Sequence, residues 1–169
     1  LIASPHREAL EARFGKQFFA TAELSIKTFQ PELIEDLQEE NKGYSEYTKL
    51  KGGAQVELDG TTYNLSSIVP KCQDKDRALR QRANQAKWDW MGEHQEQIET
   101  IYDDLVKLRH GMAQKLGYDN FVPLGYARMN RTDYGPEQLA VFRNEVKKYI
   151  VPIATRLAKE QAARIGVDK

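Results

Sequence analysis

The chain has 169 residues, and its 25 basic side chains balance its 25 acidic ones, so that the formal net charge is zero. This balance disfavours a dedicated nucleic-acid-binding or membrane-surface protein, and no apolar run approaches the ~20 residues of a membrane-spanning helix. The single cysteine, Cys72, cannot form an internal disulfide and is typical of a reduced, cytoplasmic protein. The chain also begins without methionine, and we expect it to be a piece of a longer protein.

Helical patterns dominate the first fifty residues. Ser4 followed by Pro5 predicts a helix start, because serine caps helix N-termini and proline suits the first helical position. Gly15 is expected to break this helix, and a second helix is predicted from Lys16 to about Thr28. A third helix is predicted to open at Gln30-Pro31 and to continue to Leu50.

The predicted strands lie between residues 54 and 65. Gly52-Gly53 ends the preceding helix, and two alternating runs, 54–58 and 61–65, flank Asp59-Gly60. Asp-Gly between such runs predicts a two-residue hairpin turn, because both turn positions need a positive φ. An isolated hairpin is marginal in water, so we expect this one to pack on helices.

The next two helices are predicted from an N-cap and from an apolar stripe. Asp74 is expected to cap a helix to about Met91, which Gly92 would break. The following helix, 93–116, carries apolar side chains at helical spacing, and Gly117 is its predicted C′ residue. The stripe consists of Ile98, Ile101, Tyr102, Leu105, Leu108, Met112 and Leu116.

The last third of the chain predicts a short helix from Asn120 to about Asn130 and a final helix from Pro136. Pro152 should kink the final helix, at a cost of about 3 kcal/mol unless packing compensates. The predicted fold class is mainly α: a single helical lobe over residues 1–169, made of amphipathic helices with one small antiparallel β-hairpin at about 54–65. The apolar face of the final helix is formed by Leu139, Phe142, Val146, Tyr149, Ile150, Ile153 and Leu157.

The histidines do not predict a metal centre. None of His6, His94 and His110 has a second histidine four residues on, so the chain lacks His-Glu-x-x-His. His94 lies near Glu93 and Glu96, but a solvated helix start is the better interpretation of that cluster. We therefore assign no catalytic residue and no metal ligand to this chain.

Cys72 and a basic stretch both favour a structural interpretation over a functional one. Lys71 and Lys75 flank Cys72, which would favour a thiolate, but no histidine is near in sequence and an inert thiol is favoured. The basic stretch 71–87 ends beside Trp88 and Trp90 and is diluted by acidic residues. We interpret it as an amphipathic helix with two tryptophans as packing anchors rather than a nucleic-acid site.

The order of several short segments resembles one family. Ile-Tyr-Asp-Asp-Leu-Val-Lys-Leu-Arg begins at Ile101, Lys-Leu-Gly-Tyr-Asp-Asn-Phe at Lys115, and Leu-Gly-Tyr-Ala-Arg-Met-Asn-Arg-Thr-Asp-Tyr at Leu124. Together with 37–41 and 161–164, these segments resemble the region upstream of the active site in oligoendopeptidase F-type zinc metallopeptidases, relatives of thimet oligopeptidase. The resemblance implies an α-rich upstream lobe of a two-lobed enzyme whose channel admits short peptides. Zinc in the full-length enzyme would be held downstream of the matched region.

The resemblance sets two functional hypotheses against each other. In the first, the chain is a lobe of a zinc-dependent oligopeptidase that hydrolyses short peptides, forms part of the channel wall, contacts the missing catalytic lobe of the same polypeptide, and is inactive and zinc-free alone. In the second, it is a stand-alone helical interaction or scaffold domain. A downstream reading frame with His-Glu-x-x-His would support the peptidase.

The connector 130–134 holds the only residues that we single out as substrate contacts. Arg131 and Tyr134 are large, polar-tipped side chains between two helices, and binding groups tend to sit on loops held by a rigid scaffold. If the chain forms a channel wall, either residue could touch a peptide carbonyl or carboxylate. The structural alternative is that Arg131 pairs with Asp133 or a nearby acid and that Tyr134 packs at the helix start as a staple.

Overall fold

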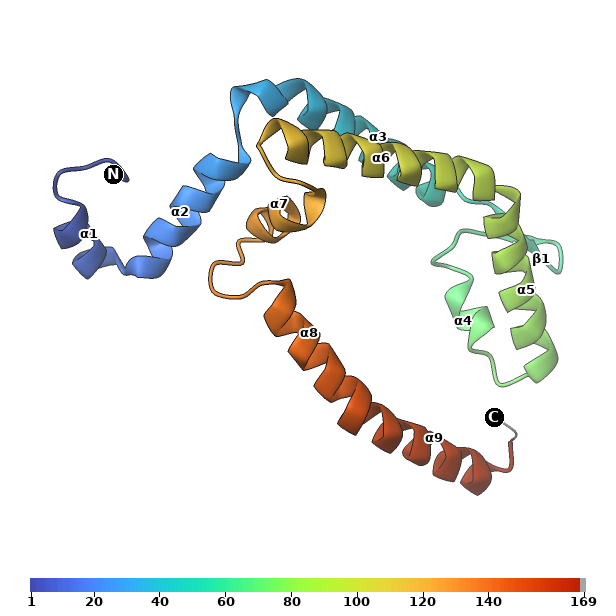
Figure 1. Ribbon diagram of the computed structural model, residues 1–169. Helices are drawn as coiled ribbons and strands as arrows, with labels where there is room; N and C mark the ends of the chain where they lie inside the picture. Colours follow the sequence, from blue (N-terminus) through green and yellow to red (C-terminus); the bar gives the residue numbers. More distant parts are fainter. Residues whose placement is uncertain (168–169) are drawn as a thin grey trace. The chain divides into compact units, whose positions relative to one another are not determined.

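The computed structural model describes residues 1–167 and is mainly α-helical with one two-stranded antiparallel sheet (Figure 1), which confirms the predicted fold class. The chain divides into two compact units, one made of Leu1–Thr28 with Val122–Lys169 and the other of Phe29–Phe121. The single lobe over residues 1–169 stays a prediction. Among the described residues, no helix has the length and apolar character needed to cross a membrane.

Two long helices form the frame of the Phe29–Phe121 unit. A 3-10 turn at Pro31–Leu33 leads into α3, Ile34–Gly52, and α6, Gln95–Lys115, packs along it (Figure 1). The helices approach closely at Gly43, where a Cβ atom would lie 3.0 Å from Cδ2 of Leu105. A glycine inside a helix costs about 1 kcal/mol relative to alanine, and this close approach gives the reason for it here.

The predicted hairpin is confirmed, with strands shorter than the two sequence runs. Strands β1, Val56–Leu58, and β2, Thr61–Tyr63, pair antiparallel with Val56 opposite Tyr63. The turn residues have φ values of 51° at Asp59 and 78° at Gly60, as a two-residue hairpin turn requires. The hairpin packs on α5 through a buried apolar cluster formed by Ala54, Val56, Leu58, Ile68, Ala83 and Trp90.

Helix α5, Arg77–Glu93, follows the short helix α4, Val69–Cys72, and departs from its prediction at both ends. Asp76, not Asp74, is the N-cap: its Oδ1 accepts a hydrogen bond from the N–H of Ala78 at 2.9 Å. Asp74 instead accepts from the N–H of Asp76 and forms the turn before the helix. Gly92 was expected to break the helix but lies inside it, because one exposed glycine lowers helix stability without removing a backbone donor.

The two tryptophans of α5 were expected to act together as packing anchors, and only one does. Trp90 is buried in the hairpin cluster, whereas Trp88 is 62% exposed. Residues two apart on a helix do not share a face, and the hairpin covers the face that carries Trp90. The prediction for Trp88 was therefore wrong.

The first two helices of the other unit are separated at Gly15, as predicted. Helix α1, Arg7–Phe14, and helix α2, Lys16–Thr28, flank this glycine, whose φ is 86°. The helix start predicted at Ser4-Pro5 was wrong by two residues. Ser4 Oγ accepts from the N–H of His6 at 3.2 Å, so that these residues form a turn ahead of α1.

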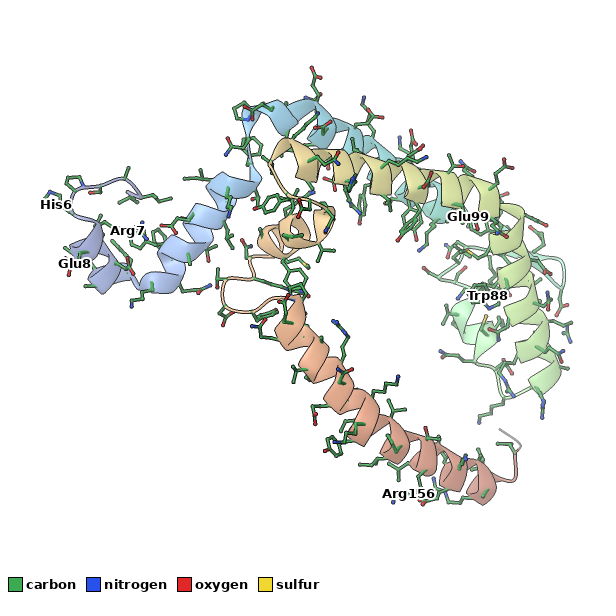
Figure 2. The ribbon with its side chains drawn as sticks, viewed as in Figure 1. His6, Arg7, Glu8, Trp88, Glu99 and Arg156 are labelled. Carbon is green, nitrogen blue, oxygen red and sulfur yellow. The ribbon has the colours of Figure 1, made fainter. Side chains whose placement is uncertain are left out.

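Arg7 joins α1 to α2 and covers the buried side chain of this helix pair (Figure 2). Its guanidinium pairs with Glu11 at 3.1 Å and with Glu23 at 2.8 Å. The same group lies 4.0 Å from the ring centroid of Phe19, which is fully buried. The hydrogen bond that Arg7 donates to Glu23 is the main reason that the pKa of Arg7 is raised.

The end of the chain forms one continuous helical run after α7, Phe121–Arg128 (Figure 1). Helix α8, Pro136–Glu145, passes through a π-helical turn, Val146–Ile150, into α9, Val151–Ile165. The sequence predicts a kink at Pro152, and the structure has a π-helical turn directly before it. The wider turn relieves the clash between the proline ring and the carbonyl four residues back.

Candidate functional site

The candidate site is the turn that follows α7. Asn130 has a φ of 55°, and its N–H donates to the carbonyl of Ala127 at 2.9 Å. The N–H of Arg131 then donates to the carbonyl of Tyr126 at 3.2 Å. This pair of bonds is the Schellman arrangement, and asparagine is the residue after glycine that best tolerates its left-handed position. The turn reverses the chain so that Arg131 comes back beside Tyr126.

Arg131 lies over two tyrosine rings. Its guanidinium carbon lies 4.6 Å from the ring centroid of Tyr126 and 5.4 Å from that of Tyr134. The sequence-predicted pair, Arg131 and Tyr134, is therefore brought together by the fold. Contacts of this kind contribute about 0.5–1 kcal/mol at exposed sites, and they orient the guanidinium plane without using its N–H donors.

Two further hydrogen bonds fix the connector around this pair. Thr132 Oγ1 donates to Oε1 of Gln17 at 3.1 Å, which ties the loop to α2. The N–H of Gly135 donates to Oε1 of Gln138 at 2.9 Å, and this contact fixes the start of α8 directly after Tyr134. Arg131 thus lies on a short loop that is anchored at Thr132 and at Gly135.

The chemistry available at this turn is recognition of an anion or a carbonyl. Arg131 is half-buried and Tyr134 is 42% exposed, so both polar tips can be reached from solvent. Among the described residues no ion pair joins Arg131 to Asp133 or to another acid, the pairing that the structural alternative expected. A planar guanidinium with free donors suits bidentate binding of a carboxylate.

Tyr126 is the member of this site that sequence reasoning missed. It lies on α7, five residues before Arg131, and nothing in helical spacing brings two such residues together. The signal was Asn130, because an asparagine just past a helix end predicts a left-handed turn that returns the next residue to the helix.

A second feature is an acidic groove of about 870 Å³ along α3 and α6. His94 lies in it, but its Nδ1 is 2.8 Å from the carbonyl oxygen of Trp90 and its ring stacks on the Trp90 ring at 4.1 Å. The apolar residues that line the groove include Ile101 and Leu105. The acidic side chains that line the groove are Glu39, Glu46, Glu93, Glu96 and Asp104.

This donor set does not fit the zinc that the resemblance implies for the full-length enzyme. His94 uses one ring nitrogen for the backbone, and no second histidine or cysteine lies in the groove, whereas zinc sites in peptidases combine at least two histidines with a carboxylate. Within residues 1–167, no group of three or more histidine, cysteine, aspartate or glutamate side chains is placed to hold a metal ion. His6 and His110 are exposed elsewhere, and Cys72 packs against the hairpin cluster.

Two arginines of the basic stretch make contacts within the Phe29–Phe121 unit. Arg82 pairs with Asp59 of the hairpin turn at 2.9 Å, and Arg80 donates to the carbonyl of Asp74 at 2.6 Å. The hydrogen bond from Arg82 lowers the pKa of Asp59, and the same contact raises the pKa of Arg82. These contacts support the interpretation of this stretch as a helix surface.

Comparisons with known proteins identify the chain's relatives among solved structures. An oligoendopeptidase F-class protein from Bacillus anthracis str. Ames matches with a TM-score of 0.93 and 49% identity, over 100% of this chain and 31% of that protein. A second oligoendopeptidase F-class structure matches with a TM-score of 0.94 and 45% identity. PZ peptidase A, solved with an inhibitor, matches with a TM-score of 0.94 and 50% identity. The latter two matches each cover 100% of this chain and 30% of the other protein.

Neither a protein-family model nor a curated protein matches the chain. The relationship therefore rests on the solved structures. Their identities to this chain are far above the range in which only a fold is shared. The chain spans 30–31% of their length. The predicted resemblance to oligoendopeptidase F peptidases is therefore confirmed, over the whole of this chain and over less than a third of each matched protein.

Proposed function

We propose that this chain is the upstream lobe of a zinc-dependent oligopeptidase that hydrolyses short peptides, and that it forms part of the wall of the substrate channel. The observation that carries this proposal is the match of all of this chain, at 45–50% identity, to part of oligoendopeptidase F-class proteins and PZ peptidase A. A stand-alone scaffold domain remains the alternative, and no contact in the described residues favours it.

The residues of this chain suit peptide binding rather than zinc chemistry. Its histidines and carboxylates do not fit a zinc site, so we place the metal and the reacting groups in the catalytic lobe of the same polypeptide. The contribution of this lobe would be to bind and orient a short peptide and to exclude larger ones. Its single cysteine supports a cytoplasmic enzyme.

Arg131 is the residue to which we give a substrate contact. The two tyrosine rings hold its guanidinium plane and leave the N–H donors available, and the anchored loop limits the entropy lost when a ligand binds. A peptide C-terminal carboxylate, or a backbone carbonyl near it, is the group that such a fork would bind. Tyr134 would add a hydroxyl beside it.

The test is to express the longer polypeptide that includes these residues and to assay hydrolysis of quenched fluorescent peptides of different lengths. We expect cleavage of short peptides, little cleavage of an unfolded protein, and loss of activity when a chelator removes zinc, with recovery on zinc addition. A gene that ends at Lys169, or a longer protein that cleaves no peptide with zinc supplied, would contradict the proposal.

A further inference from the structure

The helical run Pro136–Ile165 exposes an apolar stripe. None of the residues in α8, the π-helical turn or α9 is buried. Among the described residues of the unit made by Leu1–Thr28 and Val122–Lys169, no other helix packs against this run. The exposed fraction is 63% for Phe142, 56% for Ile150 and 54% for Leu157. The stripe is the apolar face that the sequence predicts for this helix.

The stripe is confined to one side of the helix. On α9, Ile153 and Leu157 lie four residues apart and share a face. Glu160, three residues after Leu157, ends this apolar face and pairs at 3.7 Å with Arg156, which is labelled in Figure 2. Most helical stability in proteins comes from packing such a face. A contiguous exposed apolar patch of this kind marks a contact site. We therefore expect another apolar surface to cover this face of the helix.

The charged residues of this helical run indicate the charge of the surface that covers the stripe. Residues 136–165 carry six basic and three acidic side chains, although the whole chain is neutral. A second copy would bring like charges together, whereas a surface with acidic flanks would attract them. The basic residues are Arg143, Lys147, Lys148, Arg156, Lys159 and Arg164, and the acidic ones are Glu137, Glu145 and Glu160.

We propose that the apolar stripe of α8 and α9 packs against a segment of the same polypeptide outside these residues, one that has an apolar face flanked by acidic side chains. This inference rests on the proposed function, in which the chain is one lobe of a longer enzyme. The matches support that occupant, because they include this helix in full and yet cover only 30–31% of each solved protein. The helix is then the seam between this lobe and the remainder of the enzyme.

Thiol labelling in the full-length protein tests the seam. In a background with Cys72→Ser and other reactive cysteines replaced, Leu157→Cys is compared with Lys159→Cys, which lies two residues away on the polar side. We expect the cysteine at 157 to be labelled at least about tenfold more slowly in the native protein, because it reacts only after local opening. Both should react alike in denaturant. Ile153→Cys against Thr155→Cys, which is exposed and lies two residues away on the opposite side, repeats the comparison if the first variant fails to fold.

Equal native labelling rates at the paired sites would overturn the proposal. Protection that disappears on dilution to the monomer would overturn it in favour of a second copy. Protection that arises only when anionic phospholipid vesicles are added would overturn it in favour of a lipid surface. The readout does not use activity, so a failure here is distinct from a failure of the peptidase assay.

Discussion

Nε of Arg109 donates a hydrogen bond of 2.6 Å to Oε1 of Glu40, a carboxylate that is only 6% exposed. The bond joins α6 to α3 across 69 residues of sequence. Arg109 also lies with its guanidinium 5.8 Å from the ring centroid of Phe121. A buried carboxylate must be satisfied, so this pair fixes which faces of the two helices meet.

Arg109→Ala should lower the free energy of unfolding of the full-length protein by about 1–3 kcal/mol, because the carboxylate of Glu40 loses a charged donor while staying buried. The matched control is Lys107→Ala, one half-turn away, whose pair with Asp103 is exposed. An exposed pair contributes about 0–1 kcal/mol. Urea unfolding of both variants checks the difference, and equal losses would contradict the role given to Glu40.

Gly60→Val should destabilise the hairpin by about 1–2 kcal/mol, because a β-branched residue resists a φ of 78°. A Cβ atom at Gly60 would meet no neighbour within 4 Å, so the effect would come from the backbone alone. Gly111→Ala is the control: it also meets open space but lies in α6, where alanine should be neutral or stabilising. Similar melting temperatures for the two variants would contradict this account.

The hairpin turn and several helix ends were predictable because glycine and Asp-Gly mark positions that need a positive φ. Gly15, Asp59-Gly60 and Gly117 all have the positive φ that their positions in the sequence suggested. Asp74 and Asp76 could each cap α5, because aspartate is favoured at that position in either case. The Asp76 side chain caps the helix, and that of Asp74 forms the turn before it. The choice between them was therefore beyond local reasoning.

Two of the three residues of the candidate site were predictable from their position in the sequence. Arg131 and Tyr134 stand out as polar-tipped residues of a connector, and the structure places them together. Their contact with Tyr126 depends on the left-handed turn at Asn130, which changes the direction of the chain. The exposure of Trp88 likewise depends on which face of α5 the hairpin covers.

The ion pair between Asp59 and Arg82 should make the stability of the hairpin depend on acid pH. The hydrogen bond from Arg82 lowers the pKa of Asp59 in the folded state below the unfolded value of about 3.9. The contribution is therefore present above that value and is lost as the pH falls through the folded pKa. NMR titration should give a lower pKa for Asp59 in the native protein than in Arg82→Ala. An unchanged pKa would show that the pair does not form in solution.

Arg131→Ala in the full-length enzyme should raise KM for short peptides about tenfold, with a smaller change in kcat, because one charged hydrogen bond to the substrate contributes about 1.5–3 kcal/mol. Thermal unfolding should change little, since the contacts of Arg131 are with the half-exposed rings of Tyr126 and Tyr134. Arg131→Lys should keep the charge but lose the planar fork, and recover only part of the affinity. Steady-state kinetics and unfolding curves are measured on the same preparations.

Arg13→Ala is the matched control for Arg131→Ala, because Arg13 also lies over an aromatic ring, that of Phe14 at 5.4 Å, but on α1 and outside the candidate site. It should leave KM unchanged. The effect of Arg131→Ala should also be larger for peptides with a free C-terminal carboxylate than for the same peptides with an amidated terminus, if the carboxylate is the group bound. An equal effect on both would move the contact to a backbone carbonyl. A lower melting temperature with unchanged kinetics would leave Arg131 with a purely structural role.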